Sequence, residues 1–161
     1  DIPTMLKVGN VAVSYRYEGN PPDISIPEIS PEDQQSVNGA NEHQIIDLVN
    51  TVRVRAGLGI VTWNNEVASV ARSHSDDMKV NQFFAHDSPF TGSPFDRLGV
   101  AGITYSHAGE NIAMGYRTSI SVHEGWMNSK GHRDNVLKPE YTTLGVGALS
   151  EYFTQNFVTP K

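Results

Sequence analysis

Apolar residues recur at helical spacing in two stretches of the first half of the chain. In the first stretch the repeat consists of Ile45, Ile46, Val49 and Val52. We expect this helix to begin near Asn41 and to end at Gly57 or Gly59, because glycine readily ends helices. Asn64 can then cap a second helix. The apolar stripe of that second helix is made of Val67, Val70, Ala71, His74 and Met78.

A short helix is expected next. Ser93 can cap it, Pro94 suits its first position, and Asp96 can reach back to the cap as in a capping box. Gly99 or Gly102 would end it.

Another helix is expected from residue 118 or 119 into residues 125–135. Gly131 is expected to end this helix, and His132 follows directly. A histidine just past a helix end has a fixed place on a rigid support, which favours chemistry or binding over core filling.

Two strand candidates, residues 144–149 and 152–158, close the chain, and Ser150–Glu151 between them suits a hairpin turn. Residues 103–117, which precede the last helix, are broken by glycines. Helices followed by locally paired strands predict an α+β fold or helix–sheet–helix sandwich rather than a Rossmann fold.

Residues 1–40 differ from the rest of the chain. Alternating apolar residues at 11–17 indicate a strand, and Gly9–Asn10 can turn it back against residues 6–8. Prolines at 21, 22, 27 and 31 favour an extended, linker-like segment over a helix. We therefore expect residues 1–40 to be an extended arm or the tail of an upstream module, with an ordered strap as the alternative, and residues 41–161 to be one domain.

Composition excludes several classes of protein. The chain of 161 residues has a formal net charge of −6 and no cluster of lysine and arginine, so we expect no nucleic-acid partner. It has no cysteine, which excludes a disulfide scaffold and a cysteine nucleophile. No apolar run approaches the roughly 20 residues of a membrane-spanning helix. Because the chain begins at Asp1, we expect a processed product or an excised piece. We also expect the protein to be a monomer.

Three polar residues are candidates for one cleft: His86, Glu110 and His132. They are too far apart in sequence to form a single helical motif, so only tertiary structure can bring them together. Two imidazoles and a carboxylate suit zinc with a bound water, and they equally suit a general acid/base pair. Each also has a structural alternative. His86 could be a packed histidine, Glu110 could bind backbone amides, and His132 could cap the preceding helix.

An ordered set of short motifs runs through residues 41–158. The set includes Trp63-Asn64, Phe84-Ala85-His86, Ser93-Pro94-Phe95-Asp96-Arg97-Leu98, Gly109-Glu110-Asn111-Ile112-Ala113, Trp126-Met127-Asn128-Ser129-x-Gly131-His132-Arg133-x-Asn135 and Leu144-Gly145-Val146-Gly147. Together these motifs resemble the CAP superfamily of cysteine-rich secretory proteins, antigen 5 and pathogenesis-related protein 1. More narrowly, they resemble its cysteine-free bacterial branch, the SCP-like extracellular proteins.

The resemblance implies an α-β-α sandwich with a central antiparallel sheet and a wide cleft. His86 and His132 match the two cleft histidines of the family, and Glu110 matches the glutamate of its Gly-Glu-Asn motif. The second cleft glutamate of the family has no clear match. Ser129 stands near its place, and Glu124 is a candidate substitute. The family implies Zn²⁺ or another divalent cation, held here by His86 and His132, and no organic cofactor.

The resemblance also implies a secreted, extracellular bacterial protein, with cell-wall association through a segment outside this sequence. We expect a module that binds a lipid, glycan, peptide or cell-wall fragment in its cleft. The alternative is a protease-like, metal-dependent hydrolase in which His86 and His132 hold the metal and Glu110 is the base or a ligand. A third option is a protein-interaction domain with a vestigial cleft.

Overall fold

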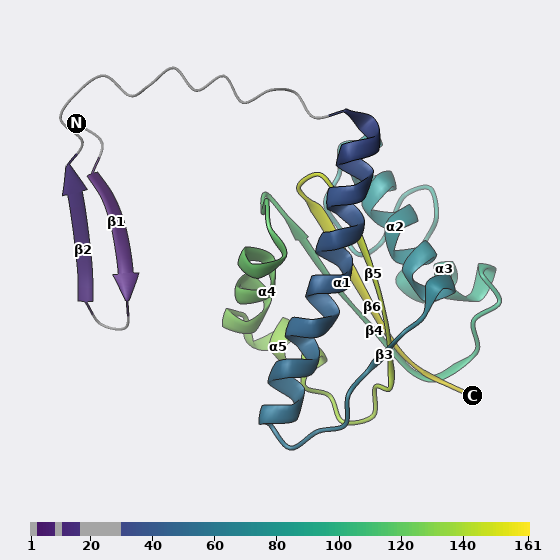
Figure 1. Cartoon of the computed structure of the whole chain (residues 1–161). Coiled ribbons are helices and arrows are strands. Elements are labelled where there is room, and N and C mark those ends of the chain that lie inside the picture. Colours follow the sequence, from purple (N-terminus) through teal and green to yellow (C-terminus); the bar gives the residue numbers. More distant parts are fainter. Residues whose placement is uncertain (1–2, 9–10, 17–29) are drawn as a thin grey trace.

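The computed structural model describes residues 3–8, 11–16 and 30–161 of the chain (Figure 1). Its elements, in chain order, are β1 (Pro3–Val8), β2 (Val11–Arg16), α1 (Pro31–Arg55), β3 (Thr62–Trp63), α2 (Asn65–Val80), α3 (Pro94–Val100), β4 (Tyr105–Met114), α4 (Ser119–Asn128), α5 (Lys130–Val136), β5 (Thr143–Leu149) and β6 (Tyr152–Pro160). Strands β1 and β2 form the expected antiparallel hairpin, with Val8 opposite Val11. The expected turn at Gly9–Asn10, and residues 17–29, lie outside the described residues.

The sheet of the domain has the strand order β3-β5-β6-β4. Strands β5 and β6 form the expected antiparallel hairpin, and β4 pairs antiparallel with β6 from Tyr105 to Met114. Strand β3 adds two residues parallel to β5 at one edge. The sheet is therefore antiparallel apart from this short edge.

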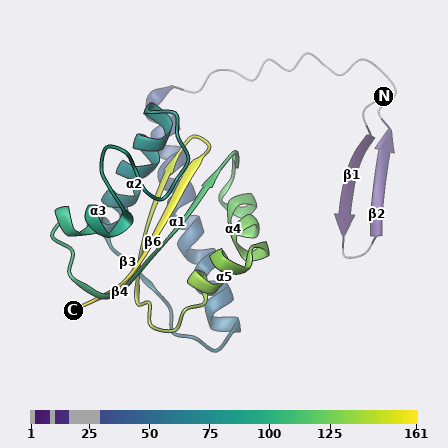
Figure 2. The same ribbon diagram turned by 180° about the vertical axis from the view of Figure 1, so that it is seen from behind.

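Helices cover both faces of the sheet, with α2 and α3 on one side and α1, α4 and α5 on the other (Figures 1 and 2). Successive residues of β5 face opposite layers. Leu144 packs in the core with Ile45 of α1. Gly145 faces α2 so closely that a Cβ atom there would collide with the backbone of Ala68. The α-β-α sandwich expected from the sequence is confirmed.

Local signals that place α2 and α3 are also confirmed. Asn64 caps α2 by accepting hydrogen bonds from the backbone N–H groups of Glu66 and Val67. Ser93 and Asp96 form the expected capping box at the start of α3. These two helices flank the loop of residues 81–93, which carries His86.

Helix α1 begins at Pro31, ten residues before the expected start at Asn41. Ser30 caps it by accepting from the backbone N–H of Asp33. A proline in the first turn loses no intrahelical hydrogen bond, so Pro31 starts the helix instead of preventing it. The expectation of an extended segment over residues 31–40 is therefore wrong, whereas the division into an arm and a domain stays a prediction.

The helix expected to end at Gly131 ends at Asn128 instead. Ser129 is extended, with φ −104° and ψ 121°, and α5 follows with Gly131 and His132 inside it. His132 therefore lies within a helix and not just past one, which corrects the sequence expectation. A glycine costs a helix only about 1 kcal/mol, so the packing of α5 against the sheet can outweigh it.

Candidate functional site

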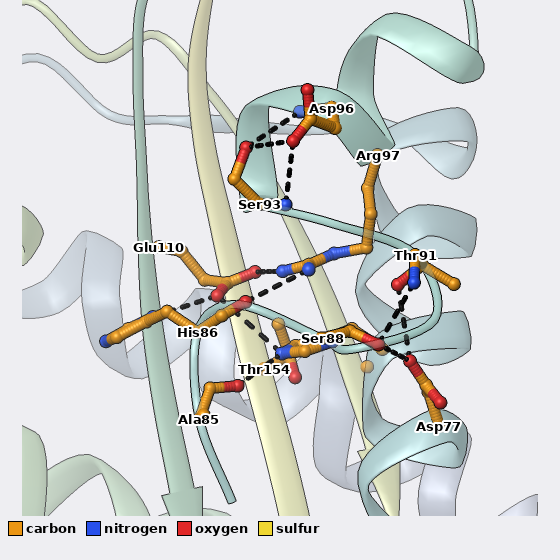
Figure 3. A network of polar contacts seen from close by, with 12 residues as sticks. Asp77, Ala85, His86, Ser88, Thr91, Ser93, Asp96, Arg97, Glu110 and Thr154 are labelled. Atoms are coloured by element: carbon orange, nitrogen blue, oxygen red, sulfur yellow. Dashed lines mark hydrogen bonds and ion pairs between the residues drawn. The ribbon is translucent and has the colours of Figure 1, made fainter.

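Glu110 is at the centre of the candidate site. It lies on β4, and its side chain is only 2% exposed. Oε2 accepts a hydrogen bond of 2.7 Å from Nη2 of Arg97, and Oε1 accepts one of 2.9 Å from Nδ1 of His86 (Figure 3). Both carboxylate oxygens are therefore hydrogen-bonded. These two partners compensate the negative charge of Glu110, as a buried carboxylate requires.

His86 lies in the loop between α2 and α3, with its side chain 50% exposed. The hydrogen bond to Glu110 raises the pKa of His86, while partial burial and the charge of Arg97 oppose this effect. The ring directs Nδ1 toward Glu110 and leaves Nε2 facing away from it (Figure 3). When the ring is protonated, Nε2 is a hydrogen-bond donor.

Arg97 fixes the loop as well as the carboxylate. Its side chain is only 5% exposed, and Nη1 donates to the backbone carbonyls of His86, at 3.0 Å, and Gly92, at 2.7 Å. One guanidinium thus holds both ends of the 86–92 loop together with Glu110, as its fork of donors allows. Sequence reasoning did not single out Arg97, which it quoted only as part of a family motif.

A second side chain holds the same loop from α2. Asp77 accepts hydrogen bonds from the hydroxyls of Ser88, at 2.5 Å, and Thr91, at 3.2 Å (Figure 3). Partial burial acts to raise the pKa of Asp77, but hydrogen bonds from Ser88, Asn81 and Thr91 outweigh it and lower the pKa. The loop that carries His86 is therefore fixed by contacts from both helices.

His74 is buried beneath the site, as expected for a core histidine. Its Nε2 donates to the carbonyl of Ala85 at 3.0 Å and lies 3.9 Å from Oε1 of Glu110. Burial lowers the pKa of His74, so the ring is neutral at neutral pH. Its role in holding the backbone just before His86 depends on tertiary contacts that the sequence does not show.

His132 faces the same region from α5. Its Nδ1 is 2.8 Å from Oγ of Ser129, and its backbone carbonyl accepts from Nδ2 of Asn111 at 3.1 Å. Burial, followed by the charge of His86, lowers the pKa of His132. The two rings thus interact electrostatically, although no hydrogen bond joins His132 to His86 or Glu110 within residues 30–161.

Asparagines tie α5 to the strand that carries Glu110. Nδ2 of Asn135 donates to the backbone carbonyl of Glu110 at 3.2 Å and to Oδ1 of Asn111 at 2.9 Å. Together with the bond from Asn111 to His132, these contacts fix α5 against the edge of β4. They set the position of His132 relative to Glu110.

Glu124, the candidate substitute for a second glutamate, does not join this network. It lies exposed on α4, and its side chain makes no hydrogen bond or ion pair within residues 30–161. A catalytic role for Glu124 has no structural support among these contacts.

A metal ion needs several donor side chains that converge on one point. Across the part of the chain that the structure describes, no three histidine, aspartate or glutamate side chains are grouped to hold a metal ion. Glu110 already has both oxygens engaged, which leaves the imidazoles of His86 and His132 as candidate ligands. Both rings have Nδ1 engaged, an arrangement that orients Nε2 for a metal, so a two-histidine site stays a prediction.

A cavity of about 870 Å³ lies where the end of α2, the end of β4 and the turn between β5 and β6 meet, and neither His86 nor Glu110 lines it. Its apolar lining consists of Val37, Phe83, Phe84, Met114 and Tyr152. Its charged lining consists of Lys79, Arg117 and Glu151. Phe84 precedes His86 by two residues, and Met114 lies on the same strand as Glu110. We call this hollow the Phe84 cavity.

The structure is thus a small α-β-α domain in which a buried carboxylate is paired with a buried arginine and a half-exposed histidine. Residues 46–159 match the model of the cysteine-rich secretory protein family, also called CAP. The chain belongs to this family and is of the bacterial SCP-like type, as expected from its motifs.

Bacterial proteins with similar sequences support this assignment. The chain is 41% identical to the Bacillus subtilis membrane protein YlbC over 158 residues, which are 98% of this chain and 44% of YlbC. It is 42% identical to Bacillus subtilis YkwD over 121 residues, which are 74% of this chain and 47% of YkwD. The chain thus spans less than half the length of either relative.

A solved structure also resembles this domain. The crystal structure of an extracellular protein containing an SCP domain from Bacillus anthracis has a TM-score of 0.81 and 40% sequence identity, and the match covers 83% of this chain and 45% of that chain. Within the residues that our structure describes, no helix is both long and apolar enough to cross a membrane.

Proposed function

We propose that this domain is an extracellular ligand-binding module whose ligand contacts His86 and extends into the Phe84 cavity. The observation that carries the proposal is the geometry of His86, whose Nδ1 is held by Glu110 while the half-exposed ring offers Nε2 to solvent. A protonated imidazole is a strong hydrogen-bond donor to an anionic or carbonyl oxygen. The site therefore suits a ligand that carries such an acceptor.

The Phe84 cavity suggests what the rest of the ligand looks like. Phe84 and Met114 are large apolar residues with exposed side chains, and both line the cavity beside Lys79 and Arg117. Apolar walls with a few charged groups are typical of ligand sites. An amphipathic, acidic fragment of the cell wall fits this combination, with its carboxylate at His86 and its apolar groups against Phe84.

The location outside the cell is part of the proposal. It is supported by the extracellular SCP-domain protein of Bacillus anthracis, to which the domain is similar in sequence and structure. Association with the cell envelope is consistent with the likeness to the membrane protein YlbC, whose other half this chain does not cover.

Calorimetry with purified muropeptides, the soluble disaccharide-peptide fragments of peptidoglycan, tests the proposal. We expect binding to the wild type and at least about tenfold weaker binding to His86→Ala, because the loss of a charge-assisted hydrogen bond costs roughly 1.5–3 kcal/mol. His43→Ala is the matched control, since His43 is an exposed histidine on α1 that packs on Trp63. Equal binding by all three proteins would contradict the assignment of the ligand to His86.

Metal-dependent hydrolysis is the second candidate. It is favoured by the two imidazoles that keep Nε2 available, but Glu110 has no free oxygen to serve as a base without releasing Arg97 or His86. A zinc-dependent cleavage of muropeptides that disappears in His132→Ala would support this function over the binding module.

A further inference from the structure

The hairpin of β1 and β2 forms a sheet of its own, separate from the four-stranded sheet of the domain. A two-stranded hairpin is marginally stable in water unless a further strand or a helix packs against it. The match to the CAP family begins at residue 46, so the hairpin precedes the part of the chain that defines the family. Membership of the family thus does not explain what stabilises the hairpin.

The pairing register divides the hairpin into two faces of different character. Residues opposite each other in an antiparallel pair share a face, and the faces alternate along each strand. Because Leu6 pairs with Val13, one face consists of Thr4, Leu6, Val8, Val11, Val13 and Tyr15. We call it the Leu6–Val13 face.

The opposite face contains both charged residues of the hairpin. It consists of Pro3, Met5, Lys7, Ala12, Ser14 and Arg16. An antiparallel sheet with one apolar and one polar face packs the apolar face against a core and leaves the polar face to solvent. The Leu6–Val13 face therefore requires an apolar partner.

Sequence similarity indicates where that partner lies. The similarity to YlbC spans 98% of this chain, so it includes the hairpin as well as the domain. The same match covers only 44% of YlbC, so the remainder of that protein is longer than the matched part. A remainder of this length is enough for a folded domain with a core of its own. A relative that shares the hairpin thus also has room for a second module.

We propose that the Leu6–Val13 face packs onto the apolar core of a second module of the same protein, which corresponds to the part of YlbC outside the match. The hairpin is then a piece of that module and not of the CAP domain. The face with Lys7 and Arg16 stays in contact with solvent. This inference does not depend on the function proposed for His86, so the two can fail separately.

Hydrogen–deuterium exchange tests the proposal on two samples, the full-length protein that contains this chain and residues 1–161 alone. We expect the hairpin amides to exchange at least about tenfold more slowly in the full-length protein, because packing suppresses local opening. Amides of α2 should exchange equally slowly in both samples, which establishes that the domain is folded in each. Equal exchange of the hairpin in both samples would overturn the proposal. So would protection of the hairpin in residues 1–161 that rises with protein concentration, since a second copy would then cover it.

Neighbouring residues on opposite faces supply matched variants of the full-length protein. Val13→Asp should make the hairpin exchange as fast as in residues 1–161, whereas Ser14→Asp should keep the wild-type protection. Val13→Thr keeps the shape of valine and its preference for strands, so it tests the same face without adding a charge. We expect it to accelerate exchange of the hairpin at least about threefold. Equal exchange of the hairpin in Val13→Asp and Ser14→Asp would contradict the assignment of the packed face.

Discussion

Arg97 and His86 bind the same carboxylate, and Arg97 also binds the backbone carbonyl of His86 itself. The arginine thus fixes the histidine in two ways, through Glu110 and through the loop. Arg97 and Glu110 are both almost fully buried. Removal of either side chain would therefore leave the charge of the other buried without a partner. This relationship connects the stability of the domain with the geometry of its candidate site.

Replacement of Arg97 is therefore expected to destabilise the protein. Arg97→Gln leaves the carboxylate of Glu110 without its main cation, and loss of one partner of a buried pair costs roughly 3–5 kcal/mol. Urea unfolding monitored by circular dichroism measures this change. Arg133→Gln is a control, because Arg133 is partly exposed and donates only to the carbonyl of Met127 in this structure. A loss of stability no larger than in this control would contradict the account.

The pKa of His86 should depend on Glu110. The hydrogen bond to Glu110 raises it, so Glu110→Gln is expected to lower it, and titration of the ring proton signals measures the difference. In the wild type, the stabilisation from this protonated pair is fully present below the unfolded-state pKa of about 6.5 and is lost as the pH rises through the raised pKa of folded His86. A pKa of His86 that is the same in wild type and Glu110→Gln would refute the assigned cause.

Buried histidines should act in the opposite direction. Burial lowers the pKa of His123 in the folded state, so its contribution to stability is present above about pH 6.5 and is lost as the pH falls toward the lowered value. His123→Leu is therefore expected to reduce the loss of unfolding free energy between pH 7 and about pH 5. His43→Leu, at an exposed position, is the control, and the same acid sensitivity in both variants would contradict this cause.

The close approach of α2 to the sheet should make Gly145 irreplaceable. A Cβ atom at this position would collide with the backbone of Ala68, so Gly145→Ala is expected to cost about 2–3 kcal/mol of unfolding free energy. Gly59→Ala is the matched control, because a Cβ atom at Gly59 meets no atom within 4 Å. Equal stability of the two variants in thermal unfolding would show that helix and sheet are not packed in this way.

Zinc binding is expected to need both histidines. Calorimetry near pH 7 and near pH 5 should show binding to the wild type that weakens at the lower pH, because protons compete for imidazole. The double variant His86→Ala/His132→Ala should bind no zinc, and His43→Ala should bind like the wild type. If wild-type protein binds no zinc at neutral pH, His86, Glu110 and Arg97 form a hydrogen-bonded cluster and the two-histidine site is refuted.

The sequence by itself determined most of the local structure. The stripe that ends at Met78, the cap at Asn64 and the capping box from Ser93 to Asp96 predicted their helices correctly, because each signal acts between residues within one or two turns. The β5–β6 hairpin was predictable for the same reason. The motifs around His86 and Glu110 also indicated the family, which the comparisons confirm.

Only the tertiary structure decided the remaining elements and the partners within the site. Strand β4 was hidden because its first half is polar and contains Gly109, which belongs there since a side chain would collide with the hydroxyl of Tyr141. The helix breaks at Ser129 and continues through Gly131 as α5. Contacts of α5 with β4, such as the hydrogen bond from Asn135, outweigh the low helix propensity of Gly131. Arg97 became a partner of Glu110 for a similar reason. A buried carboxylate pairs with a cation that lies close to it in space. The separation of two residues in sequence does not show whether they are close in space.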